Sequence, residues 1–145
     1  MQNDYSKNIK NVADIFFEEV ESKSLSSFPV DTWRSLGDEG LLGINIPQEF
    51  SGKSENHVDV INIGMKLVGN GITMGIALSW LLHLGTQYFL IYKNAKSPLR
   101  EKILKNTTQG KKTVSIAYGE PGFLGKPQNL ATNICYDDDG NMVIS

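Results

Sequence analysis

The chain has 145 residues, of which 40% are hydrophobic and 21% charged, with a formal net charge of −2, values typical of one soluble globular domain. Its N-terminus has no apolar stretch of the kind found in secretion signals, and its single cysteine, Cys135, excludes an internal disulfide framework and a cysteine metal cluster. We therefore expect a cytoplasmic protein.

Charge is unevenly distributed along the chain. Residues 93–112 carry one acidic side chain, Glu101, among seven basic ones: Lys93, Lys96, Arg100, Lys102, Lys105, Lys111 and Lys112. Such a run either meets phosphate groups or forms a solvated helix face. No aromatic residue lies within it, so it lacks a platform on which single-stranded bases stack. A nucleic-acid partner is not expected.

Two amphipathic helices are predicted at the N-terminal end. In residues 4–24, apolar side chains recur at helical spacing (Ile9, Val12, Ala13, Phe16, Phe17, Val20), and Asp14, Glu18, Glu19 and Glu21 fill the other side. A second, short helix starts at Phe28-Pro29, with Asp31 near its N-terminus, where the helix dipole favours a carboxylate. Trp33, Leu36 and Leu41 should face inward, and Gly40 permits a left-handed cap.

The next segment, residues 41–47, is bounded by Gly and Pro and is predicted to be extended, with a loop from 48 to 54. Ser54 or Asn56 can cap a third helix that runs through about Val68. Its apolar residues form two stripes, so we expect it to be substantially buried: Val58, Ile61, Met65 and Val68 in one, and Val60, Ile63 and Leu67 in the other. Residues 69–71 form the turn that follows.

The stretch from Gly71 to Tyr92 contains no charged residue and is apolar on every side of a helix. At 1.5 Å per residue it is about 33 Å long, and a helix apolar all round is buried in a protein core or in lipid. The internal Thr73, Ser79, His83 and Gln87, together with the absence of flanking aromatic belts, favour a central core helix over a membrane span. His83 is then most simply a hydrogen-bonded core histidine.

One more helix is predicted, and after it the spacing of apolar residues changes from helical to strand-like. Ser97-Pro98 suits the N-cap and first position of a further helix that ends before Gly110. Residues 113–118 are predicted to be a strand, and residues 130–136 and 141–144 a pair of strands joined by an Asp-Gly turn. The acidic cluster Asp137–Asp139 does not have the spacing of an EF-hand loop, so a plain hairpin turn is preferred to a calcium site.

These elements predict a mainly α fold: a helical bundle around a central buried helix, followed by a few β-strands that open a second domain. We place the helical domain at residues 1–112 and the incomplete β domain at 113–145. A small sheet with open edges is marginal by itself, so the chain resembles a truncated product.

Two stretches resemble the N-terminal domain of flavin-dependent acyl-CoA dehydrogenases. Residues Phe28–Gly52 follow the family pattern FP-x-x-x-W-x-x-L-x-x-x-GLLG and then I-P-x-E-aromatic-G-G, with Ser51 in place of the first of the two final glycines. Farther on, His83-Leu84-Gly85, the helix before Gly110 and the run from Ser115 to Gly122 follow the family's order. Together these matches cover nearly the whole chain.

The resemblance implies an oxidoreductase that uses FAD to desaturate the α,β bond of an acyl-CoA thioester, in a homo-oligomer without a membrane span. The family's catalytic glutamate comes from a part beyond these matches, so no catalytic residue is assigned and this fragment alone is expected to be inactive. The family's flavin motif, A-x-T-E-P-x-x-G-S-D, is altered here: Gly119 stands at the Thr, and Leu124-Gly125-Lys126 at the Gly-Ser-Asp. The resemblance assigns cofactor binding to Tyr118, Gly119 and Gly125.

By the same resemblance, Ile76, Ala77, Trp80 and Leu84 line the acyl site, where Trp80 would shorten the pocket; the alternative is that they are ordinary core residues. Glu120 is structural in the family. The altered flavin motif leaves a second hypothesis, a non-enzymatic helical interaction module that no longer binds flavin. On either hypothesis, apolar surface should be exposed and should favour self-association.

Overall fold

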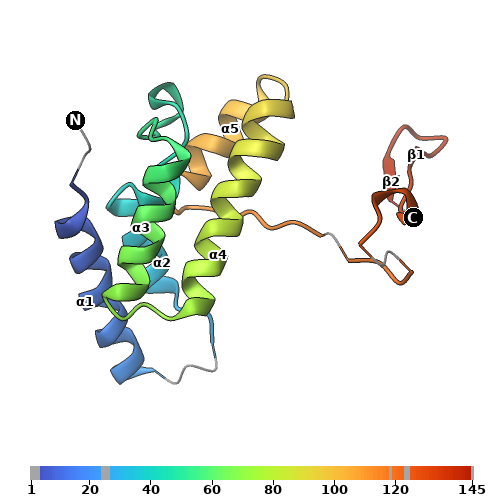
Figure 1. The fold of residues 1–145 in the computed structure, drawn as a ribbon. Coiled ribbons are helices and arrows are strands. Elements are labelled where there is room, and N and C mark those ends of the chain that lie inside the picture. Colours follow the sequence, from blue (N-terminus) through green and yellow to red (C-terminus); the bar gives the residue numbers. More distant parts are fainter. Residues whose placement is uncertain (1–3, 24–26, 118, 123–124, 145) are drawn as a thin grey trace.

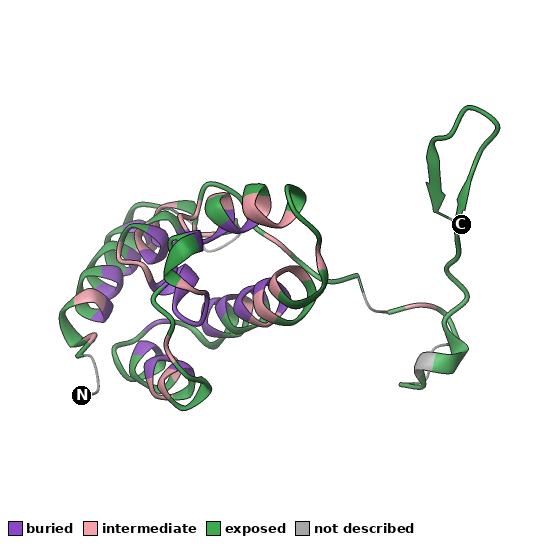
Figure 2. Cartoon of the chain, turned by 90° about the horizontal axis from the view of Figure 1, so that it is seen from above, coloured by how far each residue is buried: buried purple, intermediate pink, exposed green. Residues whose placement is uncertain are grey.

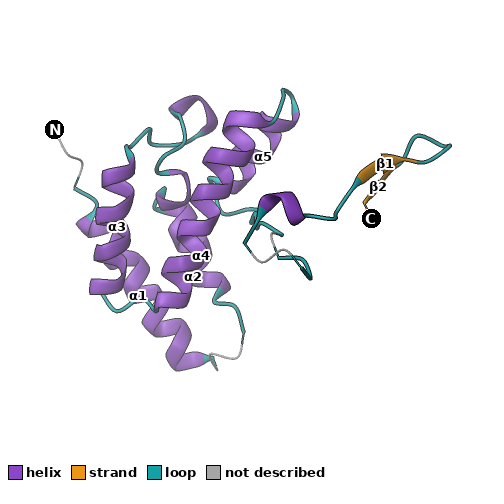
Figure 3. Cartoon of the chain, turned by 45° about the vertical axis from the view of Figure 1, so that its right-hand side comes forward, coloured by secondary structure: helices purple, strands orange, loops and turns teal. Residues whose placement is uncertain are grey.

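The computed structural model describes residues 4–23, 27–117, 119–122 and 125–144, which form a helical bundle followed by a separate β-hairpin (Figures 1 and 3). The elements are α1 (Ser6–Ser22), α2 (Val30–Asp38), α3 (His57–Gly69), α4 (Met74–Gly85), a π-helical turn (Thr86–Tyr92), α5 (Leu99–Thr107), β1 (Ile134–Tyr136) and β2 (Met142–Ile144). The predicted fold class, mainly helical with a few strands at the end, is confirmed. The boundary between residues 112 and 113 stays a prediction.

Helices α1 and α2 bury most of the faces that their spacing predicts, but Phe17, predicted on the apolar side of α1, is exposed. Ile9, Val12 and Phe16 of α1 and Trp33 and Leu36 of α2 lie in one hydrophobic core. The placement of Glu19 on the polar side of α1 was wrong. Its carboxylate is buried and accepts hydrogen bonds from the Thr32 N–H at 2.8 Å, the Thr32 hydroxyl at 2.8 Å and the Asp31 N–H at 3.2 Å.

This contact explains how α2 begins. Pro29 precedes the helix and supplies no side-chain cap, so the first N–H groups of α2 need another acceptor. The Glu19 carboxylate provides it from the neighbouring helix, and its negative charge also suits the positive end of the α2 dipole. This buried side chain thereby joins α1 to the start of α2.

The segment after α2 is turned rather than extended, which corrects the prediction for residues 41–47. Gly40 has φ +73°, as its predicted left-handed cap requires, and a short 3₁₀ turn follows at Leu41–Gly43. Leu41, Leu42, Ile44 and Ile46 are all buried, whereas an extended strand would point alternate residues to opposite faces. The turned backbone lets neighbouring apolar residues enter the same core.

Ser51 occupies the left-handed region, with φ +66° and ψ +22°, just after the 3₁₀ turn Gln48–Phe50. A residue with a Cβ in this conformation costs about 1–2 kcal/mol. We expect Ser51→Gly to raise the free energy of unfolding by about 0.5–1 kcal/mol, because the relief exceeds the extra entropy of glycine in the unfolded chain. Urea unfolding measures this, with Ser35→Gly inside α2 as the control, which should be destabilising. An equal loss in both variants would contradict the prediction.

The central stretch is helical, as predicted, but the expectation that it is buried on every side was wrong (Figure 2). Ile76, Ala77, Trp80, His83 and Leu84 are buried, whereas other large side chains of α4 and the π-helical turn are exposed: Met74, Leu78, Leu81, Leu82, Phe89 and Leu90. By length and composition Met74–Tyr92 could also cross a membrane. This is weak evidence for a membrane span, because a helix that packs in a protein core passes the same test.

Helix α3 shows the same asymmetry. The Asn56 side chain caps it by accepting from the N–H groups of Val58 and Asp59, as predicted. Of the two predicted apolar stripes, the one with Val60, Ile63 and Leu67 is buried. The stripe with Val58, Ile61, Met65 and Val68 is exposed, so the expectation of burial was wrong there. Together, α3 and α4 therefore present an apolar surface to solvent.

The C-terminal part before the hairpin differs from the prediction in two places. Residues 113–117 form no strand, and α5 begins at Leu99 with Pro98 rather than Ser97 at its N-cap. The Ser97 hydroxyl instead donates to the Glu101 carboxylate.

The predicted hairpin is confirmed, with Ile134 opposite Ile144 and Tyr136 opposite Met142, but its first strand begins at Ile134 rather than at residue 130. Asp137 accepts backbone hydrogen bonds from Asp139 and Asn141, so the acidic cluster builds the turn. Figure 1 shows the hairpin away from the bundle, and its residues are exposed.

Candidate functional site

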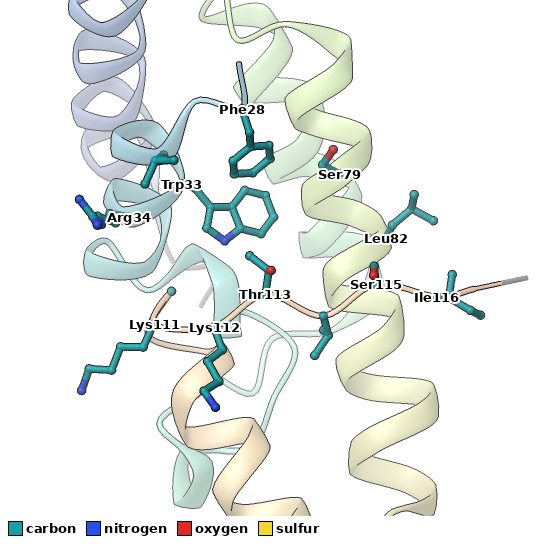
Figure 4. A pocket seen from close by; sticks show the side chains of 13 residues that line it. Phe28, Trp33, Arg34, Ser79, Leu82, Lys111, Lys112, Thr113, Ser115 and Ile116 are labelled. Carbon is teal, nitrogen blue, oxygen red and sulfur yellow. The ribbon is translucent and has the colours of Figure 1, made fainter. Parts of the chain in front are cut away.

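A cavity of about 1000 Å³ lies between α2, α4 and residues 110–116 (Figure 4). Residues 27–38 form one side, α4 another, and the segment after α5 passes across the opening. The side chains that line it include Phe28, Val30, Trp33, Arg34, Ser79, Leu82, Lys111, Lys112, Thr113, Val114, Ser115 and Ile116. The cavity is open to solvent, because residues 111, 112, 115 and 116 are exposed.

The wall on the α2 side is aromatic. The rings of Phe28 and Trp33 are 5.4 Å apart and tilted by 59°, and Trp33 is buried. The Trp33 ring also meets the His83 ring edge-on at 5.2 Å, which links α2 to α4 behind the cavity. The indole N–H of Trp33 has no hydrogen-bond partner among the described residues. The sequence predicted only that Trp33 faces inward.

His83 holds the segment that crosses the cavity. The Val114 N–H donates to His83 Nδ1 at 3.3 Å, which leaves the ring proton on Nε2. His83 Nε2 in turn lies 3.3 Å from the Thr107 carbonyl oxygen, and the Gln87 side-chain amide lies 2.9 Å from Nε2. With the amide oxygen turned toward Nε2–H, Gln87 gains the partner that this oxygen otherwise lacks. The predicted hydrogen-bonded core histidine is confirmed.

Burial lowers the pKa of the His83 imidazole below its ordinary value of 6.5, although the contact of Nε2 with the Thr107 carbonyl opposes the shift. The folded state therefore keeps the ring neutral at a pH where the unfolded chain binds a proton. We expect the free energy of unfolding to decrease as the pH falls below about 6.5, by at most about 1.4 kcal/mol per pH unit. Urea unfolding at pH 7.5 and 5.5 measures the loss.

The control for this prediction is the chain's other histidine. His83→Gln should remove much of the pH-dependent loss between pH 7.5 and 5.5, whereas His57→Gln, at an exposed position, should retain it. Equal pH dependence in the wild type and in His83→Gln would show that another group is responsible.

The rim of the cavity is cationic. Arg34, Lys111 and Lys112 line it, together with the hydroxyl-bearing Ser79, Thr113 and Ser115. Arg34 pairs with Asp31 at 3.5 Å, whereas neither lysine forms a salt bridge with a described carboxylate. The rim therefore combines positive charge and hydrogen-bonding groups beside an apolar wall. In the sequence, Lys111 and Lys112 were only part of a basic run.

The four predicted substrate residues lie on another face of α4. Ile76, Trp80 and Leu84 pack in the main hydrophobic core, Ala77 is buried as well, and none of the four lines the large cavity. The Trp80 indole N–H donates to the Leu41 carbonyl oxygen at 2.9 Å. Ser79 and Leu82 are the α4 residues that line the cavity. The assignment of the four residues to substrate stays a prediction.

The predicted cofactor residues are in the segment before the hairpin. Tyr118 lies outside the described residues. Gly119 and Gly125 are exposed, and a Cβ added at either would meet no atom within 4 Å. Glu120 accepts hydrogen bonds from the N–H groups of Ala131 at 2.6 Å and Thr132 at 3.3 Å, and the contacts with Thr132 and Ala131 lower the pKa of its carboxyl. Its role in this segment is structural, as predicted.

Comparison with known proteins agrees with the helical part of this description. Residues 6–111 match the N-terminal domain of acyl-CoA dehydrogenases. The 3-(aryl)acrylate reductase of Clostridium sporogenes (strain ATCC 15579) is 28% identical over 120 residues, which make up 82% of this chain and 31% of the reductase. The chain thus spans about a third of the length of this curated relative. No solved structure matches.

Proposed function

The chain belongs to the family of acyl-CoA dehydrogenase N-terminal domains, and on this premise we propose that it forms one wall of the acyl site of an FAD-dependent oxidoreductase. The proposed reaction adds or removes hydrogen across the α,β bond of an acyl thioester. Self-association and a cytoplasmic location remain expectations from the sequence.

The observation that supports this role most directly is the cavity between α2 and α4. Its apolar side chains, among them Phe28, Trp33 and Leu82, suit an acyl group. Its cationic rim, with Lys111 and Lys112, suits the phosphates of a carrier such as coenzyme A. A ligand of this kind is apolar at one end and anionic at the other, and the cavity has both surfaces.

The chain's own residues would bind and orient the acyl group. Phe28, Trp33 and Leu82 would exclude water from it, and exclusion of water strengthens the electrostatic interactions at a reacting centre. Lys111 and Lys112 would fix the direction in which the carrier leaves the site. When FAD is bound in such enzymes, it takes up or supplies the hydride at the β-carbon. No residue of this chain is assigned the transfer of the α-proton.

The described residues do not form a flavin cradle. Gly119, Gly122 and Gly125 have no neighbour within 4 Å of an added Cβ, and the segment that contains them is largely exposed. The chain also lacks the hydroxyl that the family pattern places at position 119. We therefore base FAD on family membership alone and assign no step of the reaction to these residues.

A second substrate class is an aryl-substituted acrylate. The relative in Clostridium sporogenes is named for reduction of such a compound. In this chain, the paired rings of Phe28 and Trp33 give the cavity an aromatic wall on which a flat aryl group can pack. On this alternative the free carboxylate, rather than the phosphates of a carrier, meets the cationic rim.

Titration of the chain with butyryl-CoA and with 3-phenylacrylate, followed by calorimetry, tests the proposal. We expect butyryl-CoA to bind, and the double variant Lys111→Gln/Lys112→Gln to weaken it about 10-fold, because two charge-assisted contacts to phosphate are lost. The matched control is Lys105→Gln, which removes an exposed charge outside the cavity.

Tighter binding of 3-phenylacrylate than of butyryl-CoA, weakened in the same double variant, would favour the aryl substrate. Binding that is equal in the wild type and the double variant would contradict the role of the rim. Failure of both ligands to bind would contradict the proposed acyl wall and favour the non-enzymatic helical module.

A further inference from the structure

A second cavity, of about 340 Å³, lies at the end of the bundle where the π-helical turn meets the start of α3. It shares no lining residue with the cavity beside α2. Its lining includes His57 at the beginning of α3 and Tyr88, Tyr92 and Lys93 at the end of the long helix. The rings of His57 and Tyr88 meet edge-on at 5.1 Å and so join these two helix ends.

The π-helical turn is what brings the aromatic and basic groups of this cavity together. Here the Lys93 N–H bonds to the Tyr88 carbonyl oxygen, five residues earlier, instead of to the residue four earlier. This register returns Lys93 to the side of the helix that carries Tyr88. Lys93 Nζ lies 5.2 Å from the centre of the Tyr88 ring and 5.3 Å from that of Tyr92. Single π-turns of this kind are frequent at functional sites.

The two tyrosine rings are tilted against each other, with a positive charge above both. Their ring centres are 5.6 Å apart and their planes differ by 40°. Lys93 forms no salt bridge with a carboxylate in the described parts of the chain, and neither tyrosine hydroxyl is hydrogen-bonded to a described side chain or backbone group. One ammonium group and two hydroxyls thus remain to bind a ligand.

Two further polar residues contribute to this cavity. Glu55 lines the same cavity, and its carboxylate accepts the Tyr5 hydroxyl at 2.7 Å. Lys93 is the cationic side chain that lines this cavity, so a ligand with one negative charge matches it better than a ligand with two. Asn45 is buried in the wall, and its side-chain oxygen has no partner among the described residues. The site is therefore polar at its base and aromatic at its side.

We propose that this cavity binds a small aromatic monocarboxylate. The ring packs on Tyr88 and Tyr92, and the carboxylate accepts a charge-assisted hydrogen bond from Lys93 and hydrogen bonds from the tyrosine hydroxyls. The site is separate from the proposed acyl wall, so neither depends on the other.

Benzoate titration of the ¹⁵N-labelled chain, followed by amide chemical shifts, tests this site. We expect saturable shifts at Asn45, His57, Tyr88 and Tyr92, and at least 10-fold weaker binding in Lys93→Met, which keeps the apolar stem and removes the charge. The matched control is Lys96→Met, at another exposed lysine outside the cavity, with less than a twofold change. Acetate, which lacks the ring, should bind at least 10-fold more weakly than benzoate.

Three results would overturn the proposal: no saturable shift around the cavity, equal binding in Lys93→Met and the wild type, or equal affinity for acetate and benzoate. Tighter binding of phenyl phosphate than of benzoate would refute the preference for a single negative charge. Both lysines are exposed, so their variants should fold, and the unperturbed amide spectrum of each variant verifies that they do.

Discussion

Replacement of Gly52 by alanine should destabilise the fold by about 3 kcal/mol or more. A Cβ at this position would overlap the Ile46 carbonyl group and lie 2.8 Å from the Gly43 carbonyl oxygen. Both neighbours are backbone atoms, and the same carbonyls accept hydrogen bonds from Ser54 and Lys53. The backbone cannot move away from the added Cβ without breaking these hydrogen bonds. The cost should therefore exceed that of ordinary overpacking, which is about 1–3 kcal/mol.

Gly69→Ala is the matched control for Gly52→Ala. Gly69 is the last residue of α3, and a Cβ added there meets no atom within 4 Å. Alanine at Gly69 should therefore be neutral or stabilising, by up to about 1 kcal/mol. Chemical unfolding of both variants gives the comparison. A loss of less than 1 kcal/mol in Gly52→Ala would mean that residues 43–54 do not pack as described.

Replacement of Glu19 by alanine should cost about 3–5 kcal/mol, the second large effect. The buried carboxylate is the acceptor for the N–H groups of Asp31 and Thr32 and for the Thr32 hydroxyl. Its removal leaves these donors unsatisfied at the start of α2 and creates a cavity between the helices. Glu18→Ala, at the exposed neighbouring position, should change the free energy of unfolding by less than about 0.5 kcal/mol.

The same carboxylate makes stability depend on pH. Burial raises the pKa of Glu19, but the hydrogen bonds from Thr32 and Asp31 and the contact with Lys23 outweigh it, so the pKa lies below the ordinary 4.5. The folded state therefore favours the charged form. Its contribution is complete above about pH 4.5 and is lost as the pH falls through the lower folded value. Glu19→Ala should thus be less sensitive to acid than the wild type in this range.

Much of the helical bundle could be predicted from local sequence because helical spacing of apolar residues is a local property. The spacing in residues 4–24 and the capping Asn56 each identified a helix from its own residues. The same spacing could not tell which of two apolar stripes on α3 would be covered. Burial of Val60 rather than Val58 depends on where α1 and α4 lie, which is not encoded within α3 alone.

The candidate site was harder to predict because its parts are distant in the chain. Trp33 and Lys112 line one cavity although about eighty residues separate them. They come together because His83, whose ring meets Trp33, accepts a hydrogen bond from Val114, two residues after Lys112. No pattern in the sequence indicated which group His83 would bind. Periodicity placed Ile76, Trp80 and Leu84 on one face of α4, but it could not show that the Trp80 indole donates to the Leu41 carbonyl.

The apolar surface that α3 and α4 turn to solvent also affects how the chain's thermal stability should be measured. Anything that covers Val58, Leu78 and their neighbours binds the folded state and not the unfolded one. By mass action, such a cover raises the melting temperature as its concentration increases. A single melting temperature for this protein therefore has meaning only together with the concentration, and the detergent or partner content, of the sample in which it was recorded.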